Sequence, residues 1–257
     1  MLLRRLIENA RTGEWSTVLV ELFIVVGGVF IGIQAANWND SRLEEERGRE
    51  VTERLIADLY QDLRAVNELV SYYDAVLLSG ENTVERLNAP EIDDLKAFVV
   101  DAYRATEYAH RGQTRATYDE IVATGSFSLI TESARRAGIV RYFGQDNSAQ
   151  LRAAVRGSPY RHRVRRLLPH DVQASIRANC SDVRDARGEI TGFEVDCNLG
   201  LPDFRIERAA SALLSDAELL LDLRLHFSIL NSQLPNLRAQ VNNIQSTIEA
   251  LESDLQQ

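Results

Sequence analysis

Residues 16–38 read STVLVELFIVVGGVFIGIQAANW, and they form the one long apolar stretch of the chain. At ~1.5 Å per helical residue, the segment from Trp15 to Trp38 spans roughly 35 Å, about the thickness of a bilayer's hydrocarbon core with its borders. A tryptophan stands at each end, where an indole favours the membrane interface. The stretch therefore predicts one transmembrane helix over residues 16–38.

The charges that flank this helix differ in sign. Arg4, Arg5 and Arg11 precede it, whereas Asp40 and Glu44–Glu46 follow it. Because positively charged flanks stay on the cytoplasmic side, residues 1–15 are predicted to form a cytoplasmic tail. Residues 39–257 then form an extracytoplasmic domain, which for a protein of the bacterial inner membrane is periplasmic.

Two other interpretations of the stretch stay open. A cleaved signal peptide is one, but its apolar region is usually ~7–15 residues long and ends in a small-x-small site. Here the stretch instead continues through Ile33 into Gln34 and Asn37. A buried helix of a soluble core is the other, and the lack of helical polar spacing between Leu22 and Ile33 weakens it.

Residues 39–257 are predicted to form one all-α domain, an elongated helical bundle. After the membrane segment, apolar residues recur at steps of mostly three or four and mark one helix face. They are Leu43, Val51, Leu55, Leu59, Leu63, Val66, Val70, Tyr73 and Leu77. The pattern predicts a long stalk helix that continues the membrane helix and ends where Asn88 and Pro90 break the chain.

Shorter helices are expected in the middle of the chain. One runs around Leu95–Tyr103, and one covers residues 114–123 and is ended by Gly125 in a left-handed conformation. A third is opened by Thr131 and continues through Phe143.

The C-terminal segment has the most regular pattern of the sequence. Steps of three and four alternate strictly through Leu220, Leu223, Phe227, Leu230, Leu234, Leu237, Val241, Ile244, Ile248, Leu251 and Leu255. This seam is typical of coiled-coil packing, with a kink or short break expected at Pro235. It faces either a second copy or, as we favour, the stalk helix of its own chain in an antiparallel pair.

Cys180 and Cys197 are the two cysteines of the chain. Between them, glycines and short β-favouring pieces predict a small hairpin. In a periplasmic domain an even cysteine count makes a disulfide the default, and closing this loop contributes ~3 kcal/mol in the chain-entropy model. Two free thiols in a cytosolic domain are the alternative.

A run rich in arginine contains no acidic residue between Asp146 and Asp171. Its basic members include Arg152, Arg156, Arg161, Arg163, Arg165 and Arg166. The run is interpreted either as a docking patch for an anionic partner, such as lipid headgroups, an envelope polymer or an acidic protein, or as a set of ion pairs with the acidic stalk.

Within the membrane segment, Glu21, Gly28 and Gly32 are candidates for a helix–helix contact. A carboxylate at that depth costs a few kcal/mol if it faces lipid, so it either snorkels to the interface or meets a polar group. Glycines four residues apart allow a second helix to approach closely.

Two stretches carry a resemblance to a family. QAANWNDSR, at Gln34–Arg42, resembles the NNWNE-type signature that follows the anchor in a family of bacterial single-pass membrane proteins of unknown function. TYDEIVATGSFSLI, at Thr117–Ile130, resembles a second element of that family, with a departure at Phe127. The resemblance implies an inner-membrane anchor and a helical extracytoplasmic domain, and it brings no catalytic residues.

The sequence predicts no enzyme and no cofactor. Its four histidines lack the spacing of metal ligands, and neither a phosphate loop nor a CxxC motif is present. The net charge of −9 argues against nucleic acid as a partner. We expect an interaction or scaffold module that contacts membrane lipid and an envelope protein or a second copy; an accessory subunit of a membrane enzyme or transporter is the alternative.

Overall fold

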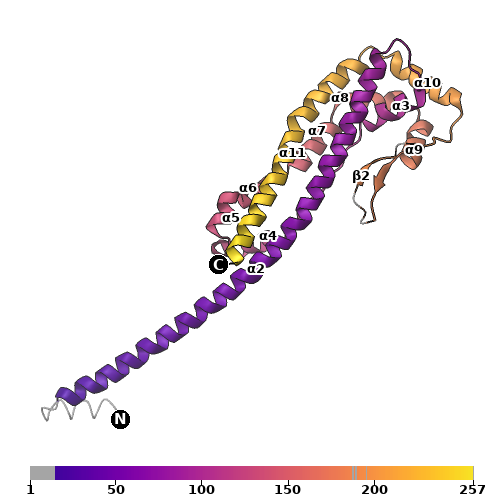
Figure 1. The fold of residues 1–257 in the computed structure, drawn as a ribbon. Helices are drawn as coiled ribbons and strands as arrows, with labels where there is room; N and C mark the ends of the chain where they lie inside the picture. The colour runs from indigo at the N-terminus through magenta and orange to yellow at the C-terminus, as the bar shows by residue number, and fades with distance from the viewer. Residues whose placement is uncertain (1–14, 187, 189, 195, 257) are drawn as a thin grey trace. The chain divides into compact units, whose positions relative to one another are not determined.

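The computed structural model describes residues 15–186, 188, 190–194 and 196–256 (Figure 1). The chain divides into two compact units, one within residues 1–53 and one over Arg54–Gln257. Helix α2 (Trp15–Asn88) contributes to both. It passes through Asp40 and Ser41 without interruption and ends directly before Ala89 and Pro90, so the predicted continuity and the predicted end of the stalk are both confirmed.

In the first unit, the apolar part of α2 exposes its side chains all round. Phe23 is 81% exposed and Trp38 is 71% exposed. Among the described residues, one helix is long and apolar enough to cross a membrane by length and composition. This agrees with the predicted span, while its orientation stays a prediction, and Arg4, Arg5 and Arg11 lie outside the described residues.

In the second unit, α2 from Arg54 onward pairs with α11 (Leu219–Leu255), and the two run in opposite directions (Figure 1). Tyr60 donates a hydrogen bond of 2.9 Å to Glu252 near the end of α11. Farther along, Asp74 forms an ion pair with Arg238, and the Phe227 ring packs against Gly80. The pairing of the C-terminal seam with the stalk of the same chain is therefore confirmed.

The seam has a second set of partners that the sequence analysis did not assign. Helix α11 also packs against α5 (Glu132–Ala137), α6 (Ile139–Gly144), α7 (Asn147–Arg156) and α8 (Pro159–Leu167). Two further short elements, α4 (Ala116–Ala123) and the 3-10 turn η1 (Phe127–Leu129), precede α5 in the chain. The buried apolar residues of α11 are Leu219, Leu223, Leu230, Leu234, Leu237, Ile244, Ile248 and Leu251. The core thus lies among the stalk part of α2, helix α11 and the short helices. The predicted pair of stalk and seam is one part of this packing.

One local expectation was wrong, and a second was wrong in part. The single helix expected from Thr131 to Phe143 is two helices, because Gly138 adopts a φ of +113° that ends α5 and begins α6. A side chain at this position would also collide with Asn243 on α11. The short break expected at Pro235 is absent, because α11 is helical on both sides of it; the alternative, a kink, stays a prediction. The proline's cost of roughly 3 kcal/mol is outweighed by the packing of the helix against its neighbours.

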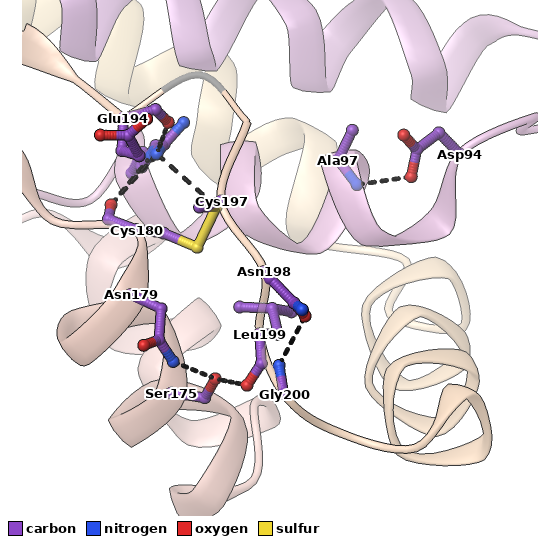
Figure 2. The surroundings of a disulfide bond; sticks show 11 residues. Asp94, Ala97, Ser175, Asn179, Cys180, Glu194, Cys197, Asn198, Leu199 and Gly200 are labelled. Carbon is purple, nitrogen blue, oxygen red and sulfur yellow. Dashed lines mark hydrogen bonds between the residues drawn. A yellow bond between two sulfur atoms is a disulfide. The ribbon is translucent and has the colours of Figure 1, made fainter.

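The far end of the second unit is built around α3 (Leu95–Arg104). It packs against α8, α9 (His170–Asn179) and α10 (Asp203–Leu214). Asp94 caps α3, since its side chain accepts a hydrogen bond from the backbone N–H of Ala97 (Figure 2). Phe98, Val99 and Tyr103 of α3 lie fully inside this core.

The disulfide predicted from the cysteine count is present. Cys180 and Cys197 are bonded to each other, with their Cα atoms 5.1 Å apart, and both are buried (Figure 2). They enclose the predicted hairpin, in which β1 (Asp182–Arg184) pairs antiparallel with β2 (Ile190–Phe193). After the disulfide, Ser175 of α9 donates a hydrogen bond to the backbone oxygen of Leu199, which holds the returning chain against α9.

Arg104 at the end of α3 holds the closed loop at two points. Its guanidinium donates to the backbone oxygen of Cys180, at 3.1 Å, and to that of Glu194. Arg104 is 8% exposed, and it also lies over the ring of Phe193. A buried guanidinium thus holds the hairpin against the helical core through hydrogen bonds to the residues before β1 and after β2.

His226 of α11 is a buried histidine that makes stability depend on pH. It is 1% exposed, its Nδ1 lies 2.8 Å from Ser158 Oγ, and burial lowers its pKa to about 4. An unfolded histidine has a pKa near 6.5, so below that pH the unfolded chain binds a proton that the folded chain does not.

We expect the neutral, buried imidazole to make its whole contribution to the free energy of unfolding above pH ~6.5. As the pH falls towards 4, about 3 kcal/mol of that free energy should be lost. Denaturant unfolding of the wild type and of His226→Gln at several pH values measures it. The difference in unfolding free energy between the two should shrink as the pH falls, and a constant difference would contradict the assignment.

Candidate anionic-partner groove

Helices α7 and α8 bring four of the six candidate arginines to one groove. Arg152 and Arg156 lie one turn apart on α7, and Arg161 and Arg165 lie one turn apart on α8, so each pair shares a helix face. Gly157 and Ser158 connect the two helices, and Pro159 begins α8, as is common for proline at a first helical position. The four arginines, with Tyr108, His162, Ala153 and Gly157, line a cavity of about 630 Å³. We call this cavity the arginine groove.

The two arginines of α8 are held by the segment that follows α3. Arg165 donates to the Thr106 hydroxyl, at 2.9 Å, and to Glu107, at 2.8 Å. Arg161 donates to the backbone oxygen of Thr106, and its guanidinium stacks 4.5 Å from the centre of the Tyr108 ring. These contacts fix both guanidinium groups before any ligand arrives, so ordering them on binding costs little.

Burial, reinforced by the charge of Arg165, lowers the pKa of Arg161. The larger part of this shift reflects the loss of water around the guanidinium, and the smaller part reflects repulsion by Arg165. An anion in the groove would relieve the repulsion between the two side chains.

The two arginines of α7 lack such anchors. Arg152 and Arg156 make no hydrogen bond or ion pair with any residue that the structure describes, and Arg152 interacts with the Tyr73 hydroxyl only through its charge. Around the groove, Glu107 is the one carboxylate that pairs with its four guanidinium groups among the described residues. The groove therefore carries a net positive charge, and its outer half offers unused donors.

The remaining two candidates lie elsewhere. Arg163 pairs with Asp216 and Asp222, at 3.2 and 2.6 Å. Arg166 is exposed on α8 and does not line the groove. Among the described residues, the run forms ion pairs with Glu107, Asp216 and Asp222. None of the three belongs to the acidic stalk, which one of the two interpretations named as the partner.

In the apolar part of α2, Glu21 has one carboxylate oxygen that is shielded from solvent and has no hydrogen-bond partner among the described residues. A side chain placed at Gly28 or Gly32 would have no neighbour within 4 Å. The surface that these three residues were predicted to offer to a second helix is therefore open, and that contact stays a prediction.

In the described part of the chain, no group of three or more His, Cys, Asp or Glu side chains is placed to hold a metal ion. In comparisons with family models, curated proteins and solved structures, the chain finds no match. The resemblance of residues 34–42 and 117–130 to a bacterial membrane-protein family consequently stays a prediction, and function is argued from the geometry.

Proposed function

We propose that the protein is a single-pass protein of the bacterial inner membrane whose periplasmic helical domain binds an acidic segment of a partner protein in the arginine groove. The proposal assigns it the role of an interaction module and no catalytic activity of its own. The observation that carries it is the convergence of four guanidinium groups on one cavity, two of them without a described hydrogen bond or ion pair.

A protein carboxylate suits the groove better than a lipid does. Glu107 already occupies the position of a carboxylate ligand on Arg165. The Cβ atoms of side chains four residues apart on a helix are ~5–6 Å apart, so Arg152 and Arg156 match two carboxylates of one acidic segment. An embedded lipid would also need an apolar surface for its acyl chains, and the groove offers little beyond Ala153 and the Tyr108 ring.

The groove is tested by titrating the full chain, in neutral nanodiscs, with a fluorescent glutamate-rich peptide. The double substitution Arg152→Glu and Arg156→Glu should weaken binding by more than about tenfold and flatten its salt dependence, because two attractive charges become repulsive. Arg166→Glu is the matched control on the exposed side of α8. An equal loss in the control would show that binding depends on overall charge, and unchanged binding in the double variant would exclude the groove.

A lipid source of the negative charge is distinguished in the same experiment. Nanodiscs that contain anionic lipid should leave peptide affinity nearly unchanged if the partner is a protein. Strong competition by the lipid would contradict the choice of partner.

The topology is a separate prediction. Because the arginines precede the span and the acidic residues follow it, a reporter that is active only in the periplasm should be active when fused after Gln257. A fusion at the same position to a reporter that is active only in the cytoplasm is the control. Cytoplasmic activity would overturn the orientation and the periplasmic location of the domain.

A second candidate function is an accessory subunit of a larger membrane complex. It is favoured by the unpartnered carboxylate oxygen of Glu21 and, two to three turns farther along the same helix, by two glycines whose surroundings are empty. Purification of the tagged chain in mild detergent would then yield a stoichiometric integral-membrane partner, which Glu21→Leu should release. A chain that purifies alone would speak against this candidate.

A further inference from the structure

Six carboxamide side chains line a second cleft, between α6 and α7 on one side and α11 on the other. The cleft has a volume of about 440 Å³. Its amide residues are Gln145, Asn147, Gln150, Asn236, Gln240 and Asn243. The whole chain has 24 asparagines and glutamines among 257 residues, so six among the nine lining residues is a strong local concentration of one chemistry.

One of these amides is buried with an unused acceptor. Gln240 is 6% exposed, and its Oε1 has no hydrogen-bond partner among the described residues. Since a buried acceptor without a donor is unfavourable, the position suits a ligand that brings an O–H or N–H group.

The rim offers further unused groups. Gln145 and Gln150 are exposed, and neither side chain makes a hydrogen bond to a described residue. By contrast, Asn147 donates to the backbone of Asn236, at 3.2 Å, which ties α7 to α11 and holds the cleft in shape. The cleft therefore has walls held together by a hydrogen bond, and amide donors and acceptors without a described hydrogen-bond partner.

We propose that this amide cleft binds an uncharged saccharide. Each hydroxyl of a sugar donates and accepts, and each carboxamide does the same with two donor hydrogens and one carbonyl oxygen. The lining contains no carboxylate, and Arg141 is its one charged residue. A volume of this size lies within the range of small-ligand sites.

A peptide fits the cleft less well. Extended peptides bind by adding to a sheet edge, and helical ones need an apolar groove. The walls here are helices, and Ala239 and the Tyr142 ring are the main apolar surface. The inference is independent of the arginine groove, which has other lining residues.

The test uses the full chain in a detergent without a sugar headgroup, because a maltoside would compete. Binding of maltotriose, cellotriose and tri-N-acetylchitotriose is measured by ligand-observed NMR. At least one should bind with a millimolar or lower Kd. The double variant Gln145→Ala and Gln150→Ala should bind it roughly tenfold more weakly, the loss expected for two uncharged hydrogen bonds.

Two further variants keep the outcome interpretable. Gln240→Leu should abolish binding, and Asn242→Ala, exposed on the same helix, should leave it unchanged. Because the rim variant changes exposed residues without described partners, it leaves the fold intact. The proposal is overturned if no trisaccharide binds, if the rim variant binds as tightly as the wild type, or if a neutral tripeptide binds while the sugars do not. Arg152→Glu with Arg156→Glu should not alter sugar binding, which separates this test from that of the groove.

Discussion

Ile244→Ala is expected to lower the free energy of unfolding by roughly 2–5 kcal/mol, the usual cost of truncating a buried aliphatic side chain. Ile244 is 0% exposed, and it lies in α11, which packs against the short helices α5–α8 and also contacts the stalk. Few neighbours are able to move into the space that is lost, because α11 is covered on more than one side. Ile248→Ala should act in the same direction. Thermal unfolding of the full chain in detergent, followed by circular dichroism, measures both.

Ser246→Ala is the matched control, since this residue is exposed on the same helix. It should change the midpoint very little. If unfolding instead depended strongly on protein concentration, and the chain sedimented as a dimer or trimer, the seam would serve oligomerisation as well, and the intrachain contacts would not account for the stability of α11.

Loss of the disulfide is the second large effect that we expect. Replacing Cys180 and Cys197 by serine should destabilise the protein by roughly 2–5 kcal/mol, as removal of a native disulfide usually does. The bond encloses a loop with a sequence separation of 17 residues. Peptide mapping without reductant should show one linked pair, and two thiols that alkylate freely would contradict the bond.

A substitution at Arg104 tests the same loop by removing hydrogen bonds in place of the disulfide. Arg104→Met keeps much of the side chain but leaves the backbone oxygens of Cys180 and Glu194 without their donor, at a cost of about 1–3 kcal/mol each where they stay buried. Because the arginine and the disulfide restrain the same loop, their effects should not be additive. Additive losses would show that the two restraints act independently.

The sequence was sufficient to predict features that repeat or that depend on composition. Alternating steps of three and four identified α11 over nearly its whole length, and Asn88 with Pro90 gave the end of α2. The even cysteine count gave the disulfide. The Gly138 break was missed although it has a local signal, a glycine that ends α5 in the left-handed conformation. The contact that leaves no room for a side chain there comes from Asn243, 105 residues away in sequence.

Both candidate sites depend on contacts that no local pattern encodes. The arginine run was visible in the sequence. Which of its four groove members are anchored, however, is decided by Thr106 and Glu107, which precede α7 by some forty residues. The amide cleft was not predicted at all. Its residues come from a loop and three helices, and glutamine on a helix surface is ordinarily no signal of a site.

The pairing of α2 with α11 has a consequence for how the domain is made. The hydrogen bond between Tyr60 and Glu252 spans 192 residues of sequence, and α11 follows every other element of its unit. At ~5–20 residues per second, synthesis of that interval takes roughly 10–40 s. During this time the apolar face of the stalk has no α11 to cover it, so the nascent domain exposes a long apolar helix face. Folding of this unit therefore depends on a late, non-local closure, and the newly made chain is the form most exposed to aggregation and to capture by chaperones.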